Sequence, residues 1–142
     1  NKNGFDNLIK FGAKIIFTVD CGTLSFEPVK TAQNQNVDVN EVYISEIKSN
    51  HIKAWKKHNS MTSNLIIAYG EIEIVILKED GSFFSEIISK NNYKMITIPP
   101  GYWFGFKGIS TETSLLLNIA NEEHDNKETE ELDVSNIEYD WS

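Results

Sequence analysis

The apolar residues of this chain recur in short runs and not with the period of a helix. Between Val42 and Ile119 these runs are separated by turn residues, and no helical period persists over a helix-length segment. Runs of this kind are typical of β-strands. They predict strands at residues 14–19, 24–28, 42–47, 64–69, 71–77, 83–88, 93–98 and 114–119. Short strands in this number indicate an all-β fold, either a sandwich or a jelly-roll barrel.

One dipeptide predicts a hairpin in the middle of the chain. Asp80-Gly81 separates residues 72–77 from residues 83–88, and this pair is the strongest short signal for a two-stranded turn. The strand at 71–77 alternates isoleucine with other residues, so we expect one of its faces to be buried. Gly70, which precedes it, can adopt the positive φ of a sharp turn.

A second turn carries aromatic residues. Pro99-Pro100-Gly101 must end the strand before it, because two prolines fix φ and remove two amide donors. Gly101 then allows a turn into Tyr102, Trp103 and Phe104, which predicts a rigid aromatic turn. These rings could stack on a ligand, or they could simply close the barrel.

The composition is that of one globular domain over residues 1–142. The hydrophobic fraction is 40% and the charged fraction is 24%, both ordinary for a folded domain. Cys21 is the single cysteine, which excludes an intrachain disulfide and a cysteine-rich metal site. No apolar run approaches the length of a membrane span. We therefore expect a cytoplasmic protein without a membrane partner.

The net charge of −8 is concentrated near the C-terminus. Nine of the 21 acids lie within residues 121–142, and the rest of the chain is formally neutral. Nucleic acid is an unlikely partner for such a chain, because its binding depends on a basic surface. The acidic segment from about residue 121 is expected to be a solvated surface segment.

Chemistry is suggested by one polar segment, Lys53-Ala54-Trp55-Lys56-Lys57-His58. If this segment is extended, alternation places Lys56 and His58 on one face and Trp55 and Lys57 on the other. A lysine in a barrel mouth can act as a base or as an amine nucleophile. The alternative is an ordinary solvated run of charge. The three histidines, His51, His58 and His124, are too scattered to predict a histidine metal site.

Longer stretches of the chain carry a family resemblance. They are Val42-Tyr43-Ile44-Ser45, Ile52-Lys53-Ala54-Trp55-Lys56-Lys57-His58, Thr62-Ser63-Asn64-Leu65, Ile98-Pro99-Pro100-Gly101-Tyr102-Trp103-Phe104-Gly105-Phe106 and Tyr139-Asp140-Trp141. With them the segment 41–121 resembles the core of the cupin family of dTDP-4-dehydrorhamnose 3,5-epimerases. The resemblance implies a double-stranded β-helix, the cupin or jelly-roll barrel, and a homodimer.

The resemblance can be followed into the metal motif of cupins. Their histidine and glutamate ligand positions fall here on Lys56, His58, Ser63 and Phe104, so three of the four residues are not metal ligands. The chain is therefore expected to act without a metal and without another cofactor, like the epimerase branch that it resembles.

The resemblance also implies site residues. The branch uses an Arg-Gly-x-His motif, in which the histidine takes a proton from a sugar carbon beside a keto group. Here the motif reads Lys53-Ala54-Trp55-Lys56, with an amine at the histidine position. The catalytic tyrosine of the family has no match after Asn118, where His124 is the nearest candidate to replace it, the alternative being a simple tail histidine. The predicted catalytic residues are Lys56, His58 and His124, and the predicted substrate-binding residues are Lys53, Asn64, Tyr102, Phe104 and Asn118.

These observations predict an epimerase-like enzyme acting on a nucleotide-linked 4-keto-6-deoxy sugar, in the biosynthesis of a cell-surface deoxysugar. Two alternatives stay open. The chain could be a binding or partner protein that kept the barrel and lost the chemistry, as the lysine at position 56 suggests. It could also be a keto-isomerase acting on the same class of substrate.

Overall fold

The computed structural model describes residues 38–142, and this part of the chain is all-β. Its strands are β1 (Glu41–Ile47), β2 (Ile52–His58), β3 (Ser63–Tyr69), β4 (Glu71–Leu77), β5 (Phe83–Ser89), β6 (Met95–Ile98), β7 (Trp103–Gly108), β8 (Ser114–Ala120) and β9 (Thr129–Glu131). A short 3₁₀ turn, η1 (Val134–Asn136), follows them. Residues 38–142 include no helix with the length and apolar character that crossing a bilayer requires.

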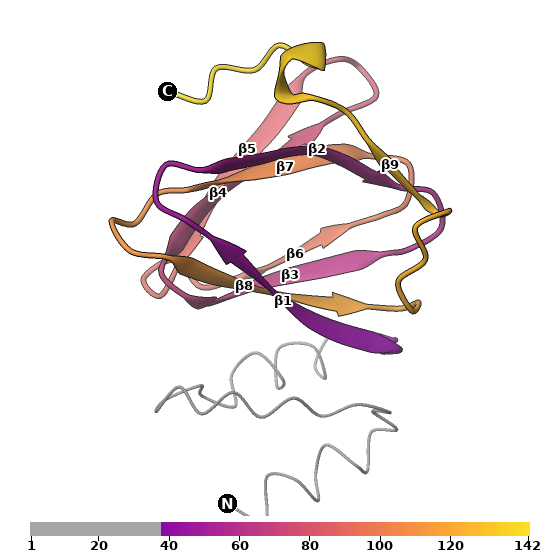
Figure 1. The fold of residues 1–142 in the computed structure, drawn as a ribbon, viewed down its shortest axis with the longest axis horizontal. Coiled ribbons are helices and arrows are strands. Elements are labelled where there is room, and N and C mark those ends of the chain that lie inside the picture. Colours follow the sequence, from indigo (N-terminus) through magenta and orange to yellow (C-terminus); the bar gives the residue numbers. More distant parts are fainter. Residues whose placement is uncertain (1–37) are drawn as a thin grey trace, which may run out of the picture.

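The strands form two antiparallel sheets that face each other (Figure 1). The four-stranded sheet has the order β1-β8-β3-β6, and the five-stranded sheet has the order β5-β4-β7-β2-β9. Two facing antiparallel sheets with crossing connections are the jelly-roll arrangement, so the predicted fold class is confirmed. The strands predicted at 14–19 and 24–28 lie outside the described residues.

The predicted hairpin forms as expected. Strands β4 and β5 pair in antiparallel register, with Ile72 opposite Ile88 and Leu77 opposite Phe83. Gly81 turns the chain between them with φ of 80°, a conformation that favours glycine. Gly70 likewise has φ of 82°, as predicted for the sharp turn between β3 and β4.

The buried core lies between the two sheets, on their facing surfaces. Ile72 and Ile74 of β4 are fully buried, as their alternation predicts. They pack with residues of the opposite sheet, including Leu65 of β3 and Leu116 of β8. Every second side chain of these strands therefore points into the barrel.

Three strands were missed by the apolar pattern. Strand β2 carries three lysines and a histidine, and the acidic β9 forms because its backbone pairs with β2. Strand β7 starts directly after the proline turn, so the prediction that Trp103 and Phe104 belong to that turn is wrong. Its Gly105 lies against β2, where a Cβ atom would come within 2.5 Å of the Cβ atom of Ala54.

After β9 the chain crosses the outer face of the five-stranded sheet (Figure 1). There Trp55 packs against Trp141, with ring centroids 5.3 Å apart, and donates its indole N–H to the carbonyl of Val134 at 3.3 Å. Tyr139 packs beside them and donates its hydroxyl to Glu73 at 2.7 Å. Trp55 therefore fixes the C-terminal segment to β2.

We expect Trp55→Ala to lower the free energy of unfolding by about 3–5 kcal/mol, because the side chain is only 1% exposed and its loss leaves a cavity. Urea unfolding measures this change. The matched control is Trp103→Ala, a half-buried indole that packs on Lys57, which should cost clearly less. Equal losses in the two variants would contradict the anchoring role of Trp55.

Candidate functional site

A cavity of about 310 Å³ lies inside the barrel. Its polar lining comes from both sheets and consists of Tyr43, Ser45, Lys53, Lys56, Asn118 and Glu131. Its apolar lining includes Leu65, Phe104, Phe106, Leu116 and Leu132. A concave, largely apolar site with a few converging polar groups is the usual form of a small-molecule pocket.

Strand β2 brings two lysines to this cavity. Lys56 lies opposite Phe104 of β7, and Lys53 lies opposite Phe106, with a bulge in β2 between them. The ammonium of Lys56 is 3.3 Å from Glu131, a carboxylate that is itself 71% exposed. The neighbouring Lys57 points to the other face, where its Nζ atom lies 4.9 Å from the ring centroid of Trp103. The predicted alternation is thus confirmed for Lys56 and Lys57, whereas the bulge places Lys53 on the same face as Lys56.

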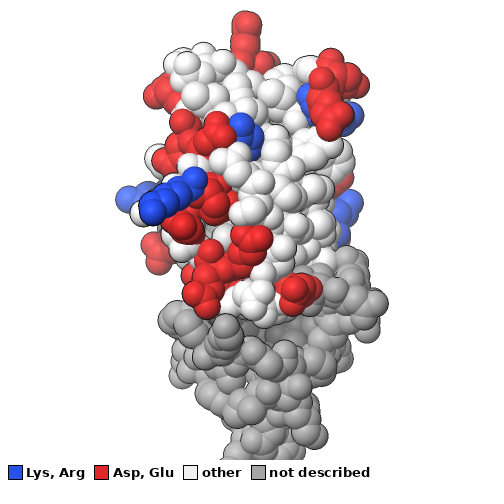
Figure 2. Space-filling model, turned by 90° about the vertical axis from the view of Figure 1, so that its right-hand side faces the viewer, with Lys and Arg blue, Asp and Glu red and all other residues white. Residues whose placement is uncertain are grey.

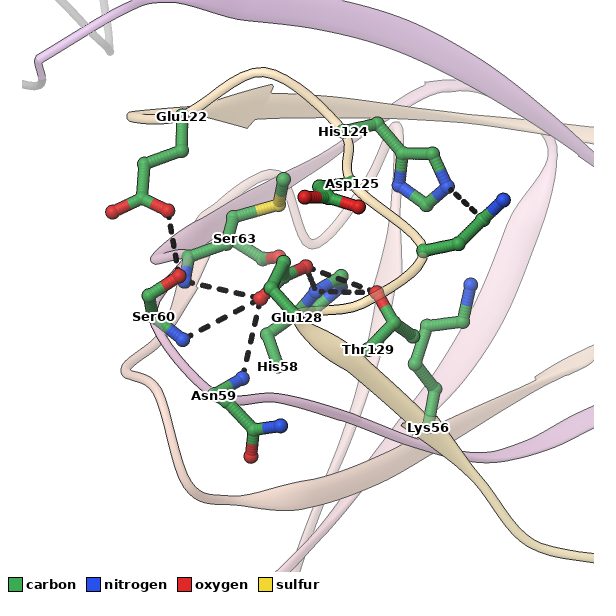
Figure 3. Close-up of polar contacts among 12 residues, drawn as sticks. Lys56, His58, Asn59, Ser60, Ser63, Glu122, His124, Asp125, Glu128 and Thr129 are labelled. Carbon is green, nitrogen blue, oxygen red and sulfur yellow. Dashed lines mark hydrogen bonds and ion pairs between the residues drawn. The ribbon is translucent and has the colours of Figure 1, made fainter.

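His58 lies on the same face as Lys56 and is buried, with 3% of its surface exposed. Its Nδ1 atom is hydrogen-bonded to Oε1 of Glu128 (Figure 3). Its ring stacks on Phe104 with centroids 5.9 Å apart, and Phe104 lines the cavity. The Nε2 atom is buried and has no hydrogen-bond partner within the described part of the chain.

The carboxylate of Glu128 is held from several sides. Its Oε1 atom accepts the hydroxyl of Thr129 at 2.9 Å. Its Oε2 atom accepts the backbone N–H groups of Asn59, Ser60 and Met61 at 3.2–3.4 Å (Figure 3). Burial raises the pKa of Glu128, but the hydrogen bonds from His58 and Thr129 outweigh it and hold the pKa below its usual value.

The contact with Glu128 fixes which nitrogen of the neutral His58 ring carries the hydrogen. An ionised carboxylate only accepts hydrogen bonds, so Nδ1 of His58 must donate to it. The neutral form of His58 therefore carries its lone pair at Nε2.

Tyr43 faces the cavity from the four-stranded sheet and was not among the predicted site residues. The side-chain amide of Asn118 donates its N–H to the Tyr43 hydroxyl at 2.7 Å. Burial, followed by the charges of Glu41 and Glu128, raises the pKa of Tyr43, although the Asn118 hydrogen bond opposes the change. A signal was present in the sequence, because Tyr43 and Ser45 alternate with the apolar Val42 and Ile44 and so share the other face of β1.

The structure sorts the predicted residues by position. It brings Lys53, Lys56, Phe104 and Asn118 to the cavity, with His58 directly behind Phe104. The remaining three do not line it. Asn64 bonds to Thr97 and to the carbonyl of Ile119, Tyr102 reaches towards Glu79, and His124 bonds to Asn126 in an exposed loop.

The acidic C-terminal segment is not simply solvated, which corrects the expectation from its charge. Glu128, Glu130 and Glu131 pair with His58, Lys57 and Lys56 in turn, so the residues at and before β9 pair with the last three residues of β2. Figure 2 shows one side of the molecule, where Asp and Glu predominate and the lysines lie beside them.

Cupin metal positions do not assemble a metal centre here. Ser63 is buried and accepts a hydrogen bond from Asn118, and Phe104 belongs to the core. Within residues 38–142 no three His, Cys, Asp or Glu side chains gather in a group that could hold a metal ion.

Comparison with known proteins identifies relatives, although no protein-family profile matches the chain. The chain is 30% identical over 111 residues to the probable low-salt glycan biosynthesis epimerase Agl13 of Haloferax volcanii, covering 73% of this chain and 69% of the relative. It is similar in structure to a dTDP sugar isomerase from Desulfovibrio desulfuricans, with a TM-score of 0.69, 25% identity, and coverage of 89% of this chain and 79% of that one. The rmlC epimerase of Mycobacterium tuberculosis shares the fold, with a TM-score of 0.62, 14% identity, and coverage of 69% and 53%.

We expect the stability that Glu128 contributes to disappear in acid. Its pKa in the folded protein is below the value of 4.5 for a free side chain, so its contribution is present above that pH. It is lost as the pH falls from about 4.5 through the lower pKa of the folded state, because the unfolded chain then binds the proton more tightly.

Urea unfolding of Glu128→Gln and of the wild type should therefore differ most at pH 6 and converge towards pH 3. The matched control is Glu131→Gln, which removes an exposed carboxylate of the adjoining strand β9. A gap between wild type and Glu128→Gln that stays constant with pH would contradict this assignment.

Proposed function

Because the chain belongs to the family of cupin-fold sugar epimerases, we propose that it is an enzyme that epimerises or isomerises a nucleotide-linked sugar in glycan biosynthesis. The substrate is a 4-keto-6-deoxy sugar, in which the keto group acidifies the neighbouring C–H bonds. The observation that carries the proposal is the His58–Glu128 pair, which leaves the lone pair of the neutral ring at Nε2, on an imidazole that stacks on the cavity residue Phe104.

In this proposal His58 removes the proton beside the keto group. A general base needs a lone pair that no protein donor occupies, and Nε2 of His58 meets this condition within residues 38–142. Glu128 stabilises the imidazolium that forms, because its charge lies next to Nδ1. The proton would move to Nε2, while the electron pair of the C–H bond passes to the keto oxygen as an enolate.

Lys56 supplies the positive charge that an enolate requires. Its side chain lines the cavity on the same face as His58, and a fixed cation beside a developing oxyanion lowers the barrier to proton removal. This role suits an amine at position 56 better than the role of base, because the ammonium already pairs with Glu131 at 3.3 Å.

The nucleotide diphosphate would be bound by lysine. The chain contains no arginine, so each of its 13 basic residues is a lysine and binds phosphate as a point charge. Lys53 lines the cavity, is exposed, and has no ion-pair partner among residues 38–142. We assign it to the diphosphate.

The remaining properties predicted from the sequence are part of the proposal. The enzyme would act in the cytoplasm as a homodimer, with its own side chains performing the proton transfers and no metal or other cofactor taking part. Light scattering on the full chain at micromolar concentration tests the dimer, and a monomer there would contradict it.

Proton exchange tests the proposed function. The protein is incubated with dTDP-4-keto-6-deoxyglucose in deuterated water, and NMR follows the protons at C3 and C5. We expect both deuterium incorporation and a rearranged sugar. Inversion identifies an epimerase, and migration of the carbonyl identifies a keto-isomerase. Binding without exchange would instead identify a non-catalytic binding protein.

His58→Asn should lower the exchange rate by about 100-fold or more, because general base catalysis contributes at least that factor. The control is His51→Asn, an exposed histidine outside the cavity, which should exchange at the wild-type rate. Nucleotide-sugar binding, measured by calorimetry, should persist in both variants. Exchange at the wild-type rate in His58→Asn would remove His58 as the base.

Lys56→Met should slow exchange by about 100-fold, the typical effect of removing one group that stabilises an oxyanion. Lys57→Met makes the same change one residue away, on the face that points out of the barrel. It should leave the rate nearly unchanged. Similar losses in the two variants would indicate that Lys56 acts only through the general charge of β2.

A further inference from the structure

A second hollow lies on the outside of the barrel, at one end of the five-stranded sheet. It measures about 230 Å³ and is lined by the end of β4, the turn after β4 and the proline turn before β7. Lys78, Glu79, Tyr102 and Trp103 provide its charged and aromatic lining. The hollow shares no lining residue with the cavity inside the barrel, so the proposed function leaves it without a role.

The alternation of side chains along β7 separates the hollow from the cavity. Phe104 points into the barrel, so its neighbour Trp103 points away from it. Strands β4 and β7 lie side by side (Figure 1), and Leu77 of β4 is the register partner of Trp103. These two half-buried side chains form an apolar floor on the outer surface of the sheet.

Backbone hydrogen bonds hold the two turns that frame the hollow. The N–H of Gly101 donates to the carbonyl of His58 at 2.7 Å, which ties the proline turn to the end of β2. In the turn after β4, the N–H of Lys78 donates to the carbonyl of Ser82 at 2.8 Å. The hollow is therefore preformed, and a ligand that enters it does not have to order the backbone first.

The aromatic side chains give the hollow a surface on which a ring can stack. Trp103 also carries the ammonium of Lys57, which lies 4.9 Å from its ring centroid. Lys57 is paired with Glu130 at 3.0 Å, so its charge is already compensated. The face of an aromatic ring has a negative potential, which attracts polarised C–H groups such as those on one face of a sugar ring.

The charged lining consists of one cation and one anion, both exposed. The ammonium of Lys78 forms no hydrogen bond or ion pair within residues 38–142. The carboxylate of Glu79 accepts the hydroxyl of Tyr102 at 3.4 Å, which is long for a hydrogen bond. Both groups are therefore available to the hydroxyl groups of a ligand, Lys78 as a donor and Glu79 as an acceptor.

The balance of charge selects the kind of ligand. Lys78 would attract an anion such as phosphate, but Glu79 beside it would repel the same anion, and a cation would meet the reverse. A neutral ligand with several hydroxyl groups satisfies both side chains. Pockets for drug-sized ligands usually measure about 300–1,000 Å³, so a hollow of about 230 Å³ suits a single ring.

We propose that this hollow binds one neutral pyranose ring of a glycan, at a site separate from the cavity. The C–H groups on one face of the ring lie on Trp103, and its hydroxyl groups donate to Glu79 and accept from Lys78. The bound ring is not a substrate of the proton transfer in the cavity. The site lets the protein hold a finished sugar unit while a nucleotide-linked sugar occupies the barrel.

Nuclear magnetic resonance of the full chain tests this site. The chain has three tryptophans, and the indole signal that is absent from Trp103→Phe belongs to Trp103. The probes are the methyl glycosides of glucose, galactose, mannose and rhamnose. We expect at least one probe to shift the Trp103 signal to saturation, with a dissociation constant of about 1 mM, as is usual for a ligand of so few atoms. The signals of Trp55 and Trp141, which pack on each other elsewhere on the sheet, should not move.

Glu79→Gln should weaken the binding of that glycoside about tenfold, because the charged acceptor is lost. The matched control is Glu112→Gln, which removes an exposed carboxylate that is bonded to Tyr69 outside the hollow. It should keep the wild-type affinity. Both substitutions affect exposed side chains, so the folded structure is expected to persist in each variant.

Four results would overturn the proposal. They are the absence of a saturable shift with every glycoside up to about 50 mM, equal affinities in Glu79→Gln and Glu112→Gln, a larger shift with inorganic phosphate than with any glycoside, and loss of the shift when dTDP is added. The last result would assign the sugar to the cavity. None of these measurements depends on turnover, so a negative result here leaves the proposed function intact.

Discussion

The partly buried carboxylate of Glu128 makes the contacts on which the site depends. Three consecutive backbone amides, one hydroxyl and one imidazole converge on it. A carboxylate leaves water only when such donors replace its hydration, so the loop after β2 and the start of β9 must both be in place. The same contact orients His58. The C-terminal segment is thus a structural part of the cavity wall and not a tail added to a finished barrel.

The rest of the barrel accommodates polar groups on its inner surface by pairing them across strands. Asn118 bonds to Tyr43 of β1 and to Ser63 of β3, which joins three strands of the four-stranded sheet. On the other sheet Lys56 is paired by Glu131. Buried polar groups are stable when hydrogen-bonded, so the contacts of Asn118 let polar side chains persist beside an apolar core.

The fold was predictable wherever one face of a strand is apolar. The isoleucines of β4, the Asp80-Gly81 turn and the apolar runs of β3 and β8 each carry a local signal, and the structure follows them. Strands β2 and β9 carry no such signal, because most of their side chains are polar and their pairing is set by partners distant in sequence. The residues of the site were likewise predictable only where the sequence carries a local signal.

Lys53, Lys56 and His58 could be found from a motif and the alternation of a strand. Glu128 could not, since a single acid among nine in the segment 121–142 has no local mark that distinguishes it. Tyr43 lay within a stretch that carried the family resemblance, but the orientation of its hydroxyl depends on Asn118, which is 75 residues away. Contacts of this kind exist only after the two sheets have formed.

The lysine at position 56 has a different meaning once β2 is known to be a strand. Side chains of a strand repeat on the same face every second residue, so Lys56 and His58 both point inward while Lys57 points outward. A basic residue placed two positions further along β2 therefore still lies on the inner wall. A shift by one position would place it outside the barrel. In the proposed function, the family motif has its histidine base at the position of Lys56, and His58 is the base in this chain. Position 56 is then free for a cation that the enolate needs.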